Sequence, residues 1–465
     1  MRGAASTAPP YWRADSARLL EQRLAVSSPA DAVIVGAGAA GLVAARALSN
    51  AGRSVVVLEA RKRIGGRVYT REDAGLPVPV DLGGEFIHGT ADVSFALLRA
   101  ANTVAIDTGG ESFIYEDGEL REGEDPFAIV ERVMARAKDL AADVSVDEFL
   151  QQLTGDEVDV DRTRRYTRMI VEGFDAADPR VASTRALADE WNGDDTGQTS
   201  RQFRPLGGYE KLLRTLHGAL NPARVQLHLA TPVRAVRWGR DGVHADATSS
   251  SGAPLDVHAR TAIVTLPVGV LQANAVRFEP ALPKAKHDAL ARLVMGPVVK
   301  LVLRFRTAFW ERVRDGKYLD ASFFHRSDAA FPTFWTLLPL RAPLMIAWAG
   351  GPKADALASH DEAALTAAAL DDLRKLFGDD SDPYGELEAV YTHDWQHDPY
   401  SRGAYSYVAA GGSDARTQLA AAVDDVLFFA GEATASTSES GTVAGALQSG
   451  ERAASEVLKA LATRD

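Results

Sequence analysis

The stretch AVIVGAGAAGLVAARAL, from Ala32 to Leu48, is followed by RSVVVLEA, from Arg53 to Ala60, and together they decide the expected fold. A β-branched run enters three glycines in GxGxxG spacing, and an Ala-rich helical stretch follows at once. A second apolar run, Val55 to Leu58, ends in Glu59 about 20 residues after the glycines, where an acid can accept hydrogen bonds from a ribose. This order predicts a dinucleotide-binding unit, the core of a doubly wound α/β fold.

Each glycine of the turn has a separate physical task. Gly36 permits a tight turn, Gly38 lets the backbone approach a pyrophosphate, and Gly41 lets the helix pack closely on the strand. The N–H groups at the helix start, at Ala39 and Ala40, would face the anion. A glycine-rich turn without function is the alternative, but both strands, the helix and the acid favour a nucleotide site.

The GxGxxG spacing alone does not distinguish NAD from FAD, and the next segments bear on that choice. They read RKRIGGR at Arg61 to Arg67 and DLGGEFIHG at Asp81 to Gly89. A two-glycine turn, Gly65 and Gly66, would let the chain pass the pyrophosphate a second time, so that Arg67 could pair with a phosphate oxygen. An ordinary basic loop is the alternative for the lysine and arginine that precede the glycines.

The composition is typical of a globular protein with more than one core. The chain has 465 residues, of which 46% are hydrophobic, and single cores rarely exceed about 250–300 residues. We therefore expect two domains. No stretch approaches the ~20 uninterrupted apolar residues of a membrane span, so we expect no membrane partner.

Cysteine content, charge and the first residues exclude several classes of function. The absence of cysteine excludes disulfides, thiolate metal sites and a flavin tethered through cysteine sulfur, and we expect no metal. A net charge of -12 argues against nucleic-acid binding and weakly favours cationic substrates. Residues 1–30 contain no apolar signal core. We expect a disordered leader or a short amphipathic helix over Asp15 to Leu24, and a cytoplasmic location.

With these segments and four later blocks, the chain resembles the flavin amine oxidase superfamily, which includes monoamine oxidases, polyamine oxidases and flavin-dependent histone lysine demethylases. The resemblance extends from about residue 31 to the C-terminus. Its later blocks are RPLGGYEKLL at Arg204 to Leu213, VMGPVVKLVLRF at Val294 to Phe305, WQHDPYSRGAYSYV at Trp395 to Val408, and FFAGEATASTSESGTVAGALQSGERAA at Phe428 to Ala454.

The resemblance implies noncovalently bound FAD in a doubly wound, Rossmann-like domain assembled from three chain segments. These segments would be residues 31–90, 204–280 and 390–465. A substrate-binding domain with a mixed sheet and helices would comprise residues 91–203 and 281–389, and residues 1–30 would be a leader.

The resemblance also implies residues around the cofactor beyond the glycine turns. Val233 would contact the adenine through its backbone, and Gly431 and Glu432 would neighbour the ribityl and pyrophosphate. Thr442 and Val443 would begin a helix whose N–H groups face the polar edge of the isoalloxazine. The remaining members of this set are Ala60, Arg61, Leu82, Gly83, Gly84, Glu85, Trp395, Tyr400 and Gly441.

Lys300 is the first candidate for chemistry. In VVKLVLRF the odd positions are apolar, whereas Lys300 and Arg304 share the other face of the expected strand. By this pattern alone, Lys300 lies on a solvated strand face. The resemblance implies instead that it hydrogen-bonds, through a water, to flavin N5.

The other catalytic candidates come from the resemblance alone. Tyr405 would be one wall of an aromatic cage that orients the amine. The chain differs from monoamine oxidases at two positions. Ala404 replaces their flavin-linked cysteine, and Thr442 lies near the position where they have the second tyrosine of the cage. His88 matches a histidine of animal polyamine oxidases, and Glu85 replaces a small residue. Either side chain could bind a distal ammonium, while Glu85 could equally pair with an arginine.

These observations together predict an FAD-dependent amine oxidase that acts on a small-molecule amine, with polyamines and secondary amines as the candidate substrates. It would transfer a hydride to flavin N5, reduce oxygen to hydrogen peroxide, and give an imine and then an aldehyde. The alternatives are an L-amino-acid oxidase, a histone-type demethylase, a quinone-dependent dehydrogenase, and a flavin-fold binding module without oxidase activity.

Overall fold

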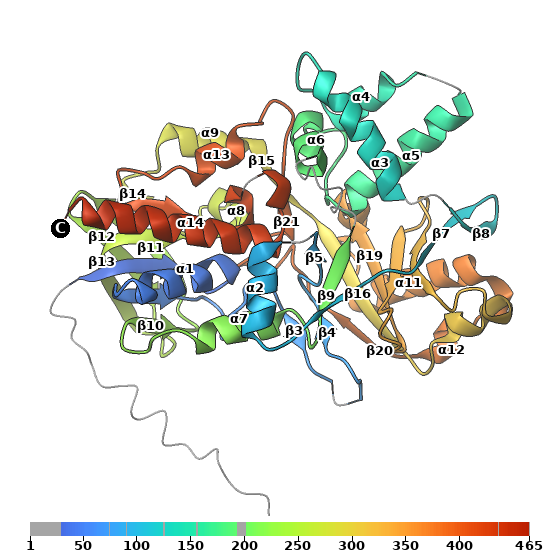
Figure 1. Ribbon diagram of the computed structural model, residues 1–465, viewed down its shortest axis with the longest axis horizontal. Helices are drawn as coiled ribbons and strands as arrows, with labels where there is room; N and C mark the ends of the chain where they lie inside the picture. The colour runs from blue at the N-terminus through green and yellow to red at the C-terminus, as the bar shows by residue number, and fades with distance from the viewer. Residues whose placement is uncertain are drawn as a thin grey trace, which may run out of the picture.

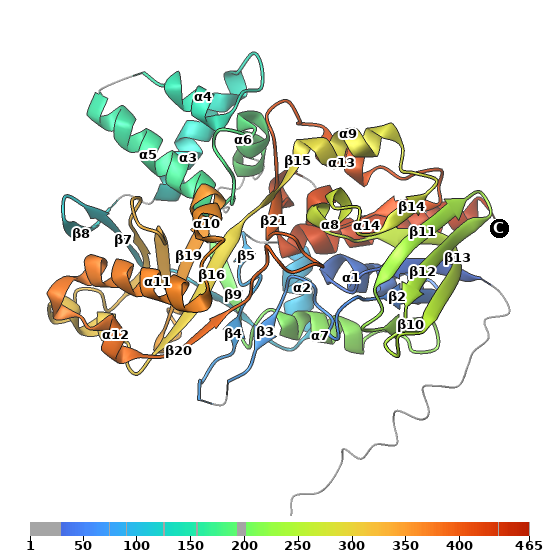
Figure 2. The ribbon, with the colours of Figure 1, turned by 180° about the vertical axis from the view of Figure 1, so that it is seen from behind.

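The computed structural model forms two sheet-containing lobes and a helical lobe (Figure 1), and Figure 2 shows the reverse side. The expected leader, with its possible helix over Asp15 to Leu24, lies outside the described residues. The structure describes residues 29–73, 75–89, 91–123, 126–154, 157–192, 201–435 and 437–464.

The first sheet has eight strands and unites three distant parts of the chain. Its order is β10-β2-β1-β13-β12-β11-β14, and β22 also pairs with β13. β1, β2, β10, β13 and β22 run parallel, with Ile34 opposite both Val57 and Ile263. The strands are β1 (Ala30–Val35), β2 (Val55–Leu58), β10 (Val225–His228), β11 (Val233–Gly239), β12 (Gly242–Thr248), β13 (Pro254–Val264), β14 (Arg277–Glu279) and β22 (Leu427–Phe429). The predicted assembly from three segments is confirmed.

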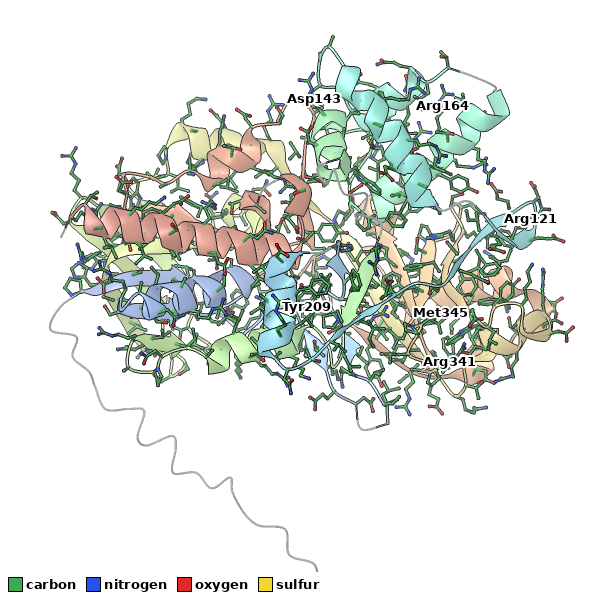
Figure 3. The ribbon with its side chains drawn as sticks, viewed as in Figure 1. Arg121, Asp143, Arg164, Tyr209, Arg341 and Met345 are labelled. Atoms are coloured by element: carbon green, nitrogen blue, oxygen red, sulfur yellow. The ribbon has the colours of Figure 1, made fainter. Side chains whose placement is uncertain are left out.

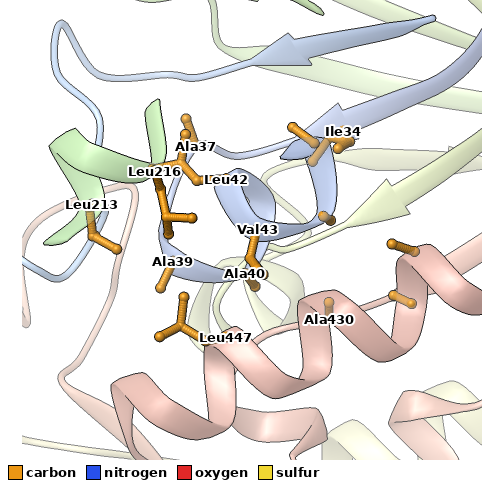
Figure 4. Packing of buried hydrophobic residues seen from close by; sticks show 14 of the residues in the cluster. Ile34, Ala37, Ala39, Ala40, Leu42, Val43, Leu213, Leu216, Ala430 and Leu447 are labelled. Atoms are coloured by element: carbon orange, nitrogen blue, oxygen red, sulfur yellow. The ribbon is translucent and has the colours of Figure 1, made fainter. Parts of the chain in front are cut away.

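One face of this sheet packs against α1 (Ala39–Asn50), α7 (Glu210–Gly218) and α14 (Val443–Ala462). Figure 4 shows the apolar side chains of these helices meeting beside the glycine turn, with Leu447 of α14 close to α1. A Cβ on Gly450 would lie 2.3 Å from the Ala40 carbonyl oxygen. Glycine is therefore required where α14 crosses α1.

The opposite face belongs to a second apolar core. This core contains residues of the parallel strands, of the antiparallel strands β11 and β12, and, apart from the single residue Ala186, of three α-helices. The helices are α8 (Val268–Gln272), α9 (Lys284–Arg292) and α13 (Ala415–Ala420). The parallel strands are thus covered on both sides, as a doubly wound sheet requires.

The second sheet has seven strands in the order β20-β16-β19-β18-β17-β7-β8. β7 and β17 pair in parallel and the other neighbours are antiparallel, so the predicted mixed sheet is confirmed. Its strands are β7 (Glu111–Glu116), β8 (Glu119–Glu122), β16 (Val298–Phe305), β17 (Ala321–His325), β18 (Thr333–Thr336), β19 (Leu344–Gly350) and β20 (Leu387–Thr392).

The two faces of β16 meet different surroundings. Its odd residues, Leu301 to Phe305, enter a core with α10 (Gly351–Leu357) and α11 (Glu362–Phe377). Met345 of the adjacent strand belongs to the same core and is labelled in Figure 3. Val302, on the other face, packs in a separate cluster with Leu82 and Trp335. The face that carries Lys300 is therefore covered, which contradicts the solvated-face interpretation.

A helical lobe lies above the second sheet in Figure 1. Its helices share one core with Tyr407 of β21 (Tyr405–Val408). They are α3 (Pro126–Ala135), α4 (Val146–Gln151), α5 (Glu157–Gly173) and α6 (Thr184–Asn192). α12 (Pro383–Glu386) packs beside α11. Besides several short 3-10 helices, the other elements are β3 (Thr70–Arg71), β4 (Val80–Asp81), β5 (Ile87–His88), α2 (Asp92–Ala100), β6 (Ala105–Asp107), β9 (Gln202–Pro205) and β15 (Leu293–Gly296).

The numerical domain boundaries stay predictions. α9 lies beyond residue 280 but contributes to the core of the first sheet. β20 runs through residue 390 and pairs with β16 of the second sheet. In the described part of the chain, no helix combines the length and apolar character needed to cross a membrane.

The close approach at Gly41 generates a stability prediction. A Cβ there would lie 2.0 Å from the Gly36 carbonyl oxygen, so the helix or the turn must shift. We expect Gly41→Ala to lower the free energy of unfolding by about 1–3 kcal/mol, measured by urea denaturation. Gly218→Ala is the control, because an added Cβ meets nothing within 4 Å there and should stabilise by about 0.5–1 kcal/mol. Equal effects of the two substitutions would contradict the packing role of Gly41.

Candidate active site

A cavity of about 570 Å³ joins the first sheet, the second sheet and the helical lobe. Every residue predicted for the site lines it except Gly41, whose position is explained by helix packing. The fold therefore brings the predicted residues together around one cavity. The cavity has a polar end at the glycine turn and an aromatic end at β16, β18 and β21.

Glu59 organises the polar end. Its Oε2 accepts from the Ala37 N–H at 2.8 Å, and its Oε1 accepts from the Arg61 N–H at 2.8 Å. The carboxylate is only 4% exposed, so it is held between the glycine turn and the end of β2. This geometry leaves a fixed acceptor where a ribose is expected.

The second glycine turn crosses directly over the first. Gly65 and Gly66 have φ values of +100° and +61°, which L side chains rarely adopt. The Gly65 N–H donates to the Ala37 carbonyl at 2.9 Å, and a Cβ on Gly66 would lie 3.4 Å from Gly38. The backbones of the two turns thus form a surface without side chains, which fits the close approach of a pyrophosphate.

Arg67 follows this turn and is already engaged by protein groups. Its Nη1 donates to the Ala404 carbonyl at 2.7 Å and to Glu432 Oε1 at 2.9 Å. Glu432 is buried, and its Oε2 accepts from the Ser406 hydroxyl at 2.8 Å. The predicted pairing of Arg67 with a phosphate stays a prediction, since the structure shows it linked to Glu432.

Two helices begin at the cavity, as predicted for the starts of α1 and α14. No side chain caps α1, and its first residues, Ala39 and Ala40, line the cavity. Thr442 caps α14, with its Oγ1 accepting from the Gly445 N–H at 2.9 Å. Helix N-termini stabilise anions, so the cavity can accept negative charge at two separate places.

Trp395 and Tyr400 line the cavity from a loop that is fixed by a partly buried acid. The Trp395 indole donates to the Leu82 carbonyl at 2.9 Å. Asp398, between them, accepts from Arg61 at 2.8 Å and interacts with His393 at 2.9 Å. Burial tends to raise the pKa of Asp398, but His393 and Arg61 outweigh it and hold that pKa well below its usual range.

Lys300 lies at the aromatic end and is 3% exposed. Its Nζ donates to Glu85 Oε2 at 2.7 Å and to the Gly83 carbonyl at 3.3 Å. Glu85 Oε1 accepts from Arg204 at 2.8 Å and from the Trp335 indole at 3.2 Å. Glu85 was expected either to bind a distal ammonium or to pair with an arginine, and the structure shows the pairing with an arginine.

The charges of this cluster govern the ionisation of Glu85. Burial favours the neutral acid, but Lys300 and then Arg204 outweigh burial and lower the pKa of Glu85 to about 2. Glu85 is therefore a carboxylate at neutral pH. Its single negative charge lies between two buried cations, of which Lys300 lines the cavity and Arg204 does not.

Tyr405 and His88 form part of the aromatic end. The Tyr405 hydroxyl donates to the Phe174 carbonyl at 2.6 Å, and a Cβ on Gly441 would lie 3.5 Å from its ring. The His88 ring meets that of Phe174 edge to face at 5.3 Å. Burial lowers the pKa of His88 to about 4, so its imidazole is neutral at pH 7. Its Nδ1 has no hydrogen-bond partner within the described residues.

Several residues of this site were not identified from sequence. Arg204 begins the segment RPLGGYEKLL, Asp398 lies in the segment from Trp395 to Val408, and His393 lies just before that segment. The sequence of these segments does not predict the ion pairs that the three side chains form. No sequence pattern near Trp335 predicts its contact with Glu85, because Trp335 lies on β18, far from Glu85 in the chain. Among the described residues, no three His, Asp or Glu side chains gather into a metal site.

Comparisons with known proteins agree with this geometry. A family model described as "Flavin containing amine oxidoreductase" matches residues 39–458. Polyamine oxidase 4 of Oryza sativa subsp. japonica is 28% identical over 93% of this chain and 89% of its own length. Lysine-specific histone demethylase 1 homolog 3 of Arabidopsis thaliana is 30% identical over 92% of this chain, but the chain spans only 30% of that protein.

Solved structures of similar fold include two amine oxidases. Cyclohexylamine oxidase from Brevibacterium oxydans IH-35A has a TM-score of 0.77 and 24% identity, covering 94% of this chain and 100% of its own. Putrescine oxidase bound to putrescine has a TM-score of 0.75 and 22% identity, covering 93% and 99%. Since the family model matches nearly the whole chain, the protein belongs to the flavin-containing amine oxidoreductase family, and its cofactor is FAD.

Proposed function

We propose that the protein is an oxidase that converts an amine to an imine, with oxygen as the electron acceptor. The observation that carries this proposal is the buried Lys300, held by Glu85 in the wall of the nucleotide-binding cavity. Bound there, FAD would supply a hydride acceptor for the substrate carbon, and oxygen would take up the two electrons to give hydrogen peroxide. Water then hydrolyses the released imine to an aldehyde.

The polar end of the cavity would hold the nucleotide part of FAD. Glu59 would accept hydrogen bonds from the ribose, and the crossed glycine turns with the start of α1 would bind the pyrophosphate. The start of α14 would stabilise negative charge on the reduced ring. The chain has no cysteine, so we propose that these contacts hold FAD noncovalently.

At the aromatic end, Lys300 would be the catalytic residue that reaches the flavin through a water. Glu85 and Arg204 would be positioning residues, because they act on Lys300 and on each other through the ion pairs. Tyr405, fixed by its hydroxyl bond to Phe174, would orient the amine beside Thr442. Because His88 is neutral at pH 7, it would accept a hydrogen bond rather than repel a cationic substrate.

The cavity offers less support for an L-amino-acid oxidase. That reaction needs an arginine for the substrate carboxylate, and the arginine beside Lys300, Arg204, pairs with Glu85 at 2.8 Å and does not line the cavity. Demethylation of lysine residues is the second candidate, because demethylase homologues are among the relatives. The chain covers 30% and 53% of two of those proteins, so their activity carries less weight here.

The proposal is tested by screening the purified yellow protein in an oxygen electrode with peroxide detection. We expect oxygen uptake, with equal peroxide formation, for at least one member of a panel of monoamines, diamines, polyamines, amino acids and methylated lysine peptides. Flavin reduction by an amine that is reversed only by a quinone would identify a dehydrogenase instead. No flavin reduction by any amine would overturn the proposed reaction.

The buried charge of Glu85 generates a prediction about stability and pH. Glu85→Gln leaves Lys300 and Arg204 uncompensated, so we expect the free energy of unfolding at pH 7 to fall by about 3–5 kcal/mol. The depressed pKa stabilises the fold above pH 4.5, the ordinary value, and this stabilisation is lost as pH falls towards about 2. The difference in the free energy of unfolding between wild type and variant, measured by denaturant titration, should therefore become smaller as the pH falls from 4.5 towards about 2.

Glu388→Gln is the control, because Glu388 pairs with Arg304 at 3.3 Å on the same sheet but is 40% exposed. An exposed pair contributes about 0–1 kcal/mol. Equal losses in the two variants would contradict the buried role of Glu85.

Lys300→Met separates a catalytic role from a structural one. We expect the variant to retain FAD but to slow flavin reduction, reoxidation or both by at least about tenfold, equivalent to about 1.4 kcal/mol. The measurement is anaerobic stopped-flow reduction with the best amine, followed by mixing with oxygen. The FAD dissociation constant and the flavin spectrum are recorded in parallel.

Lys286→Met provides a matched control. Lys286 is also buried, but it donates to the carbonyls of Gln418 and Leu419 at 2.7 Å and does not line the cavity. It should lower stability without changing either half-reaction. If Lys300→Met likewise alters only stability, the catalytic assignment is wrong.

A further inference from the structure

Five acidic side chains of the described residues line the cavity, and four have clear partners. Glu59 accepts two backbone N–H groups. The others pair with cations: Glu85 with Lys300 at 2.7 Å, Glu190 with Arg416 at 3.3 Å, and Glu432 with Arg67 at 2.9 Å. The fifth acid is Asp175.

Asp175 lies just after α5, at the aromatic end of the cavity. The residue before it, Phe174, accepts the Tyr405 hydroxyl through its carbonyl at 2.6 Å. Asp175 is thus close in the chain to the anchor of the proposed cage residue. Tyr405 and Asp175 are also near enough for the carboxylate charge to raise the pKa of Tyr405, after the larger effect of burial.

The carboxyl group of Asp175 is incompletely satisfied. The Trp191 indole is its hydrogen-bond donor, while Oδ2 is buried and has no partner in the part of the chain that the structure describes. Burial raises the pKa of Asp175 well above its usual range, and the negative charge of Glu190 raises it further. A buried carboxyl without a cation is costly, so a cationic ligand would complete this site.

The surroundings of Asp175 suit an organic cation. Phe174 meets His88, Phe127 and Trp191 at ring distances of 5.3, 5.2 and 5.5 Å. Aromatic faces attract ammonium groups, and the attraction grows when the cation is desolvated. The alkyl chain of such a ligand would pack against this apolar surface, while its charged end would supply the partner that Oδ2 lacks.

We propose that Asp175 binds a second ammonium group of the substrate, so that the enzyme prefers diamines or polyamines over monoamines of the same length. This inference rests on the proposed amine oxidation and adds the residue that selects the substrate. The fold leaves the choice open, because the names of two solved structures of this fold refer to a diamine, putrescine, and to a monoamine, cyclohexylamine.

The test compares α,ω-diamines with n-alkylamines in which a methyl group replaces the far ammonium. Oxygen uptake gives kcat and KM for each pair with the FAD-loaded wild type, Asp175→Asn and Asp178→Asn. Asp178 is three residues away, pairs with the exposed Arg180 at 2.7 Å and does not line the cavity. It therefore controls for the same chemical change outside the site.

We expect wild type and Asp178→Asn to prefer the best diamine over its matched alkylamine by at least about tenfold in kcat/KM. Asp175→Asn should lose that preference, mainly through a higher KM for the diamine, and keep its activity on the alkylamine. A merely structural role would change both substrates equally. That result, or a wild type that treats the two series alike, would overturn the proposal.

Two further outcomes are distinguishable. If the wild type oxidises no amine, the proposed function fails and this inference fails with it. If Asp175→Asn does not retain FAD, Asp175→Ser is measured instead, and an absence of diamine preference in the wild type still overturns the assignment. If water alone satisfies the Asp175 carboxyl group, a folded Asp175→Asn variant will keep the wild-type preference for diamines. That result would also overturn the proposal.

Discussion

The close packing of α1 against α14 is the constraint on which the cavity depends. A Cβ on Gly450 of α14 would lie 2.3 Å from the Ala40 carbonyl of α1, while within the first unit a Cβ on Gly41 would lie 2.0 Å from the Gly36 carbonyl of the turn before α1. These approaches place the first turns of both helices at the same edge of the first sheet. Their N-termini consequently act on one cavity although one helix begins at Ala39 and the other at Val443.

Charge in the rest of the cavity is balanced by residues from separate elements. Glu85 joins Lys300 of β16 to Arg204 of β9, and Glu432 joins Arg67 to the segment around Ser406. Each acid thereby holds two parts of the chain in register as well as neutralising a cation. Such buried pairs need good geometry to offset the loss of hydration, which makes the position of each side chain specific.

Local sequence predicted the parts of the site that form locally. The glycine turn, α1 and Glu59 are close in the chain, and their spacing has a direct geometric meaning. The burial of Lys300 could not be predicted by pattern, because alternation along β16 shows two faces but not what covers them. Glu85 and Arg204 are 119 positions apart, and Glu85 and Lys300 are 215 apart. A local sequence pattern cannot predict contacts between residues so far apart in the chain. The catalytic role of Lys300 was therefore predicted only from the resemblance to the family.

The late position of β22 and α14 in the chain has a consequence for folding during synthesis. β22 pairs with β13, and α14 covers α1, only after residues 427–462 have left the ribosome. Until then, the edge of β13 that pairs with β22 and the side of α1 that meets α14 remain uncovered. Exposed apolar surface favours aggregation of nascent chains. Residues 427–462 thus cover the first core late in synthesis, and because α14 begins at the cavity, we expect stable flavin binding only once these residues are in place.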